Sequence, residues 1–79
     1  MEQIEELIGY IARALVDDPD AVEVEALDGD NTIVVELTVA KGDLGKVIGR
    51  GGRTINALRQ VVRAHKEARG RKVVVDLVD

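Results

Sequence analysis

The stretch DLGKVIGRGGRTINALR, residues 43–59, holds three glycines within four consecutive positions, 49–52, with Arg50 among them. Because glycine lacks a Cβ atom, it permits positive φ and close approach of another chain, at a cost in conformational entropy. Apolar residues with helical spacing flank the glycines on both sides. We therefore predict a helix–loop–helix unit whose loop consists of residues 49–52.

The two helices expected beside the glycine loop differ in length. The first covers residues 42–48, with Asp43 as its N-cap or an early acidic residue. Its apolar side consists of Leu44, Val47 and Ile48. The second runs from 53 to 68, and Gly70 is placed to stop it. Its inward stripe consists of Ile55, Leu58, Val62 and either Val61 or His65. A cationic stripe on another face consists of Arg59, Arg63 and Lys66.

The remaining segments predict one more helix and three strands. Residues 2–16 carry apolar residues at the period of an amphipathic helix. That stripe consists of Ile4, Leu7, Ile8, Ile11 and Leu15. Alternation predicts strands at residues 22–27, 32–40 and 72–78, and DGDN at 28–31 predicts a hairpin turn. The order helix–strand–strand–helix–helix–strand predicts an α+β fold of two layers, with three helices on one face of a three-stranded sheet.

The composition of the 79 residues favours one small domain with an aliphatic core. The chain has no Trp or Phe and a single Tyr. It has no Cys either, and this absence excludes disulfides and thiolate metal sites. Its one histidine, His65, has no second His or Cys with which to share a metal ion. No apolar run reaches the length of about 20 residues that a membrane span needs, and the acidic N-terminus is unlike a signal peptide. We expect a cytoplasmic protein without metal, cofactor or small-molecule substrate.

Charge is distributed unevenly along the chain. Residues 1–40 carry eleven acidic residues and one basic residue, whereas residues 41–72 carry ten basic residues and two acidic ones. The net charge is −4, but a local basic region matters more to a polyanion than the total does. A nucleic acid is therefore a reasonable partner for the second half. In the alternative interpretation, the two halves pair with each other across the fold.

The glycine loop has the features of a phosphate-binding site. It precedes the N-terminus of a helix, where free N–H groups and the helix dipole favour an anion. Arg50 places a guanidinium at the tip of the loop, and guanidinium groups suit phosphate. Lys46 lies one turn before the loop, and Arg53 opens the next helix. These features predict a cradle for a phosphate backbone; the alternative is a plain turn between two helices.

The segment VIGRGGRTINAL, residues 47–58, resembles the K-homology (KH) domain family through its I-G-x-x-G loop with an apolar helix on either side. In that family the loop clamps the backbone of about four single-stranded nucleotides. The order of elements matches the prokaryotic, type II arrangement of the fold. Residues 1–79 as a whole look like one KH domain of the small bacterial stand-alone KH proteins of the KhpA type.

The resemblance implies RNA-binding roles for the loop and its neighbours. The residues concerned are Lys46, Val47, Ile48, Gly49, Arg50, Gly51, Gly52, Arg53, Thr54, Ile55 and Arg59. Apolar residues of this set, with Leu37 and Val39 of the second strand, would border a groove for the bases. The groove would have no aromatic ring for stacking, so we expect weak, salt-sensitive and poorly selective binding. Thr54 either caps the following helix or contacts phosphate, and the cationic stripe is either a solvated face or an extension of the phosphate track.

The resemblance also implies partners: a homodimer, or a complex with a larger KH-containing protein, in RNA chaperone-like regulation tied to cell elongation and envelope growth. Other classes of function fit less well. The loop lacks the Gly-Lys-Ser/Thr of a P-loop, and Thr54 stands where G-x-G-x-x-G needs its third glycine. A helix-turn-helix DNA-binding module with residues 53–66 as recognition helix is one alternative. An interaction module that uses helix 2–16 or a sheet edge, without nucleic acid, is another.

Overall fold

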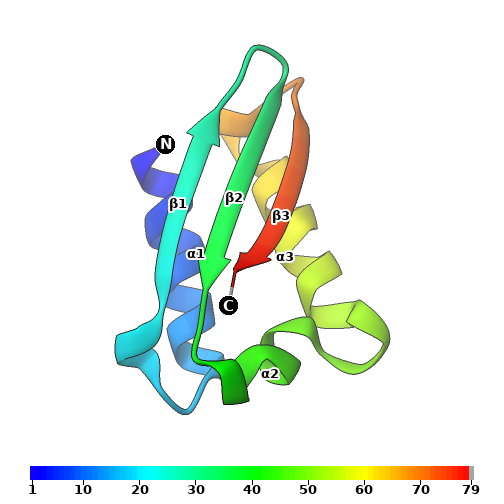
Figure 1. The fold of residues 1–79 in the computed structure, drawn as a ribbon. Coiled ribbons are helices and arrows are strands. Elements are labelled where there is room, and N and C mark those ends of the chain that lie inside the picture. The colour runs from blue at the N-terminus through cyan, green and yellow to red at the C-terminus, as the bar shows by residue number, and fades with distance from the viewer. Residues whose placement is uncertain (79) are drawn as a thin grey trace.

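The computed structural model of the chain describes residues 1–78. Its helices and strands, in chain order, are α1 (Glu2–Leu15), β1 (Glu23–Asp28), β2 (Thr32–Thr38), α2 (Leu44–Ile48), α3 (Arg53–Ala64) and β3 (Lys72–Val78) (Figure 1). Single turns of 3-10 helix connect them at Pro19–Ala21, Lys41–Asp43, Arg50–Gly52 and Lys66–Ala68. The predicted α-β-β-α-α-β order and the α+β fold class are confirmed.

The three strands form one sheet in the order β1-β2-β3. β1 pairs antiparallel with β2, and β3 pairs parallel with β2 on its other side. The hairpin between β1 and β2 is closed by Gly29, whose N–H donates to the carbonyl of Thr32 at 2.8 Å. The parallel pair needs a crossover, and α2 and α3 supply it. Figure 1 shows α1 behind β1 and α3 behind β3, so the helices share one face of the sheet.

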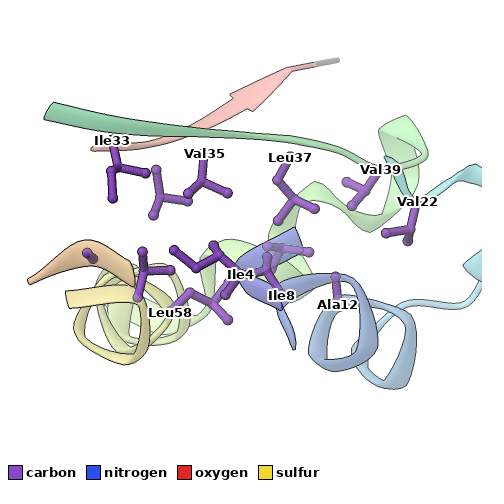
Figure 2. Close-up of a cluster of buried hydrophobic side chains, with 13 residues drawn as sticks. Ile4, Ile8, Ala12, Val22, Ile33, Val35, Leu37, Val39 and Leu58 are labelled. Atoms are coloured by element: carbon purple, nitrogen blue, oxygen red, sulfur yellow. The ribbon is translucent and has the colours of Figure 1, made fainter. Parts of the chain in front are cut away.

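The core lies between this face and the helices. Ile33, Val35 and Leu37 of β2 are fully buried and alternate with half-buried residues, as expected for a strand covered on one side. Figure 2 shows these side chains directed toward the helices, where Ile4 and Ile8 of α1 and Leu58 of α3 meet them. The core is entirely aliphatic, as the composition predicts.

Several predicted boundaries near the sheet are wrong by one or two residues. β1 begins and ends one residue later than predicted, at Glu23 and Asp28. β2 ends at Thr38, although Val39 beyond it is still buried. α1 ends at Leu15, because Val16 takes an extended backbone with φ −95° and ψ 162°. The chain turns away there, which leaves Leu15 39% exposed, and Ala12 completes the buried stripe instead.

The predicted end of the long helix is wrong by four residues. α3 stops at Ala64, because His65 takes an extended backbone with φ −72° and ψ 141°. The Nδ1 atom of His65 accepts the N–H of Glu67 at 3.1 Å, a local hydrogen bond that competes with a continued helix. Gly70, with φ +77°, therefore turns the chain into β3 and does not stop α3. The inward stripe continues with the half-buried His65, while Val61 is exposed.

Candidate nucleic-acid interface

All three glycines of the loop have positive φ. Gly51 (φ 63°, ψ 17°) and Gly52 (φ 80°, ψ 14°) lie in or near the left-handed region. Gly49 (φ 75°, ψ 168°) lies in a region that only glycine populates. A Cβ atom on Gly49 would also lie 2.3 Å from the Oγ1 atom of Thr54. The turn between α2 and α3 therefore requires glycine at position 49, whereas Gly51 and Gly52 supply left-handed backbone that glycine adopts most readily.

The loop presents its backbone and two cations to solvent. Arg50, Gly51 and Arg53 are exposed, and a Cβ placed on Gly51 would have no heavy atom of the described chain within 4 Å apart from its two neighbouring residues. Among residues 1–78, neither Arg50 nor Arg53 forms an ion pair with a carboxylate. Their charges are therefore available to an anion.

No side chain of residues 1–78 caps the first turn of α3 with a hydrogen bond. The N-cap residue is Gly52, and no side-chain hydrogen bond caps the helix. The interpretation of Thr54 as the capping residue is therefore wrong, because its side chain packs under Gly49. The N–H groups at the start of a helix lack intrahelical partners and favour anions. This end of α3 can accept an anion without displacing a cap.

Lys46 is directed toward carboxylates. Its Nζ atom lies 3.2 Å from Oδ2 of Asp17 and 3.6 Å from Oδ1 of Asp43. The hydrogen bond and charge of Asp17, assisted by Asp43 against the effect of burial, raise the pKa of Lys46. Its positive charge is partly neutralised by these two carboxylates, so we expect a smaller contribution to phosphate binding than from Arg50 or Arg53.

Asp43 connects α2 to the segment that follows α1. Its side chain is buried, and its two oxygens accept the N–H groups of Asp17 at 3.2 Å and Asp18 at 3.1 Å. Asp43 is the N-cap residue of α2, as predicted, but within residues 1–78 its side chain makes no capping bond to this helix. Burial acts to raise the pKa of Asp43, but the two N–H donors and Lys46 outweigh it and hold this pKa below its usual range. Asp43 thereby fixes the helix that leads into the glycine loop.

The expected apolar groove is only partly present at the surface. Val47 and Leu37 have no exposed surface and Val39 has 4%, so the prediction that these side chains border a groove is wrong. β2 is the central strand, and the helices cover its apolar face. Of the predicted apolar set, Ile48 is 38% exposed and Ile55 is half-buried. The strand that packs against α3 at the edge of the sheet is β3.

A cationic hollow of about 400 Å³ lies between α3 and β3. We define it by its four basic lining residues, Arg59, Arg63, Arg71 and Lys72. Lys66 of the predicted cationic stripe does not line it, because α3 ends before that residue. Arg71 and Lys72 cannot be associated with α3 from the sequence, since the strand order that brings them there is not a local property of the sequence.

The acidic and basic halves of the chain make few direct contacts. Within the part of the chain that the structure describes, the carboxylates of residues 1–40 pair with two cations of the second half: Asp17 with Lys46, and Asp28 with Arg71. The interpretation that the two halves neutralise each other across the fold is therefore largely wrong. Most of the basic charge remains at the surface of α3, the loop and the start of β3.

The order of elements, the mixed sheet and the glycine loop between two helices define a KH domain of the type II arrangement. The chain belongs to the KhpA/KhpB KH domain family, whose family model matches residues 5–77. It is 47% identical over 73 residues to the RNA-binding protein KhpA of Caldanaerobacter subterraneus, a match that covers 92% of this chain and 97% of that protein. It is 42% identical to KhpA of Chlamydia trachomatis, over 96% and 97% of the two chains. KhpA of Aquifex aeolicus is 37% identical over the full length of both.

The structure also bears on membrane insertion. No helix of residues 1–78 combines the length and the apolar character required to cross a bilayer.

Proposed function

We propose that this protein binds single-stranded RNA without catalysis, through the glycine loop. The observation that carries the proposal is the loop itself. Gly51 is exposed at the start of α3, between Arg50 and Arg53, and within residues 1–78 this helix start has no side-chain cap and the two arginines form no ion pair. A sugar-phosphate chain can approach such a backbone closely. The phosphate groups then meet N–H donors and guanidinium groups together. The similarity to proteins named RNA-binding supports RNA as the nucleic acid.

The bases would lie beside the loop, on Ile48 and Ile55 and along the outer edge of β3. Both isoleucines have exposed surface, and among residues 1–78 no strand pairs with the outer side of β3. An edge strand offers unpaired N–H and C=O groups, which can form hydrogen bonds with base edges. Aliphatic surface without an aromatic ring forgoes the roughly 1–3 kcal/mol per base that stacking supplies. We therefore expect modest affinity and low sequence preference.

The wider role that we propose is that of an RNA chaperone-like regulator in the cytoplasm, with residues 1–79 as a single KH domain. It would act as a homodimer or with a larger KH-containing protein, in cell elongation and envelope growth. The support for this part of the proposal is the family resemblance alone. Size-exclusion chromatography with light scattering would test self-association; a strictly monomeric chain at high concentration would argue against the homodimer.

The RNA proposal is tested by the double substitution Arg50→Asp and Gly51→Asp. Asp adopts the left-handed conformation more readily than most residues, so the fold should persist. The variant loses a guanidinium contact and gains repulsion, and a hydrogen bond to a charged group is worth about 1.5–3 kcal/mol. We expect at least about a tenfold loss of affinity for a fluorescent oligouridylate, measured by anisotropy.

The matched control is Arg50→Asn with Gly51→Asn, which has the same shape without the negative charges. It should bind more tightly than the Asp variant and more weakly than the original chain. Unchanged affinity of the Asp variant would rule out the loop as the RNA site. A competition among single-stranded RNA, single-stranded DNA and duplex DNA completes the test, and a preference for duplex DNA would favour the helix-turn-helix alternative.

A further inference from the structure

The open face of the sheet, opposite the helices, combines exposed apolar side chains with carboxylates. Figure 1 shows α1 and α3 behind the strands, and no other described element lies across the front of the sheet. We propose that this face docks a basic segment of a partner protein, in which Lys or Arg alternates with aliphatic residues. The proposal concerns a protein partner and a surface other than the glycine loop, so it stands independently of the RNA function proposed above.

An apolar row crosses the open face. Because Ile33 and Val35 are buried on the helix side, Val34 between them faces the open side. The strand register places Leu27 of β1 and Val74 of β3 on either side of Val34. Leu27 is 44% exposed and Val74 is 46% exposed. Exposed apolar side chains with a polar rim are typical of a protein interaction site.

A row of carboxylates lies directly beside the apolar row. Glu36 of β2 stands opposite Glu25 of β1 and Asp76 of β3, two residues along each strand from the apolar row. Within the described part of the chain, none of the three side chains forms an ion pair or a hydrogen bond. Carboxylates directly opposite each other repel. Bound cationic groups would relieve this repulsion.

A hollow of about 460 Å³ adjoins the carboxylate row near the end of β2. One oxygen of Glu5 accepts the N–H of Ala26 at 2.8 Å, so this carboxylate is held at the outer edge of β1. Val24 and Val78 also line the hollow, and they offer apolar contacts to the aliphatic stem of a Lys or Arg side chain. No basic residue lines it, and its carboxylates are those of Glu5, Glu23, Glu25 and Glu36.

Charge complementarity defines the occupant as a cationic protein segment. In an extended segment, side chains two residues apart point to the same side and are separated by about 6.6 Å, the spacing of the apolar and carboxylate rows. A segment aligned with the strands can therefore place an aliphatic side chain over Val34 and a Lys or Arg over Glu36. Phosphate groups of RNA would be repelled by the same carboxylates. Among the residues of the three strands, Lys72 is the one basic residue, and it lies beyond the apolar row, away from the carboxylates.

The probe is a fluorescent synthetic peptide that has Leu and Lys in alternation at every second position and Ser between them. Its affinity for the full chain is measured by anisotropy at low and at high salt. The test variant is Glu25→Gln with Glu36→Gln, which keeps the size of both side chains and removes two carboxylates from the row. The matched control is Glu2→Gln with Glu6→Gln, which removes the same charge from exposed positions of α1. Circular dichroism checks that both variants fold.

The test variant should bind this peptide at least about fivefold more weakly than the original chain at low salt, because two exposed ion pairs are lost. The control variant should bind the peptide as the original chain does. The loss in the test variant should shrink at high salt, since exposed charges are screened there. Equal losses in the two variants would show that net charge attracts the peptide, and would overturn the docking face.

The apolar row is tested with Leu27→Thr and a second peptide in which Ser replaces every Leu. The original chain should prefer the Leu peptide over the Ser peptide by at least about threefold, because apolar surface is buried. Leu27→Thr should reduce this preference while leaving the affinity for the Ser peptide unchanged. A preference of the same size in the original chain and in Leu27→Thr would overturn the proposed docking of an aliphatic side chain on this row.

Two further measurements distinguish other occupants. The test and control variants should bind an oligouridylate equally, and weaker RNA binding by the test variant would place RNA on this face and overturn the proposal. Light scattering at low salt should give the test variant and the original chain the same mass. A larger mass for the original chain alone would make a second copy of the chain the occupant, which also overturns the proposal.

Discussion

Among the residues that the structure describes, Asp43 is the one charged side chain that is buried, at 4% exposure. Its carboxylate receives two backbone N–H groups of the segment after α1 and the ammonium of Lys46. Hydrogen bonds to an ionised acceptor are stronger than neutral ones, so the ionised form is the one that the fold favours. The position of α2, and with it the start of the glycine loop, therefore depends on the charge of a single residue.

Replacing Asp43 with Asn should lower the free energy of unfolding at neutral pH. The folded pKa of Asp43 lies below its ordinary value, which is about 3.9 in the unfolded chain. Its stabilising contribution is therefore present above about pH 4 and is lost as the pH falls through the folded pKa. Urea unfolding at a series of pH values should show the two proteins converging in stability below about pH 4. A difference that stays constant down to about pH 2 would contradict this role.

The loop glycines should differ in their tolerance of a side chain. Gly51→Ala places a methyl group in open space, at the usual left-handed cost of about 1–2 kcal/mol, which a more restricted unfolded chain partly offsets. Gly49→Ala combines a region that only glycine populates with a contact of 2.3 Å to Thr54. We expect Gly49→Ala to cost about 2 kcal/mol or more, and Gly51→Ala to cost about 1 kcal/mol or less. Urea unfolding measures both, and equal costs would refute the conformational explanation.

Among the helices, strands and turns, the sequence predicts correctly those whose boundaries are set by residues close to them in the chain. β3 has the predicted bounds, residues 72–78, because alternation and the flanking Gly70 define them within a few positions. The hairpin turn and the glycine loop are likewise found where Gly, Asp and Asn cluster. The end of α3 is not predictable in this way. The residue that ends it, His65, accepts a hydrogen bond from the backbone N–H of Glu67 through its side chain, and the spacing of apolar residues does not indicate this bond.

The candidate site depends in part on contacts between segments that are distant in the sequence. Arg50 and Arg53 can be selected as candidates from the sequence, because they flank glycines at the start of a predicted helix. Which strand adjoins α3 cannot be predicted in this way, because the parallel pairing of β3 with β2 arises from tertiary contacts. Alternation along β2 therefore predicts a groove bordered by Leu37, which is buried in the structure, and gives no reason to include Lys72. Asp43 had a signal that was not used: it is the single acidic residue between positions 41 and 66.

At the scale of the whole molecule, opposite charges occupy different regions. The basic side chains gather on α3, the loop and the start of β3, whereas acidic side chains populate α1, β1 and the open face of the sheet. On that face Glu36 of the central strand lies between Glu25 of β1 and Asp76 of β3 in the strand register. Like charges directly opposite each other destabilise a sheet. The separation that keeps the basic region available to a polyanion therefore carries a cost in stability.

This cost predicts that Glu36→Gln stabilises the protein. The amide keeps the size of the side chain and removes repulsion from two neighbouring carboxylates, each pair being worth roughly 0.2–1 kcal/mol. Urea unfolding at low salt should show a gain of that order. The gain should shrink in high salt, because exposed charges are screened within about 3 Å at 1 M. Glu23→Gln, opposite Thr38 in the register, removes the same charge and should gain less. If both substitutions stabilise equally, the net charge of the molecule, and not the carboxylate row across the sheet, governs its stability.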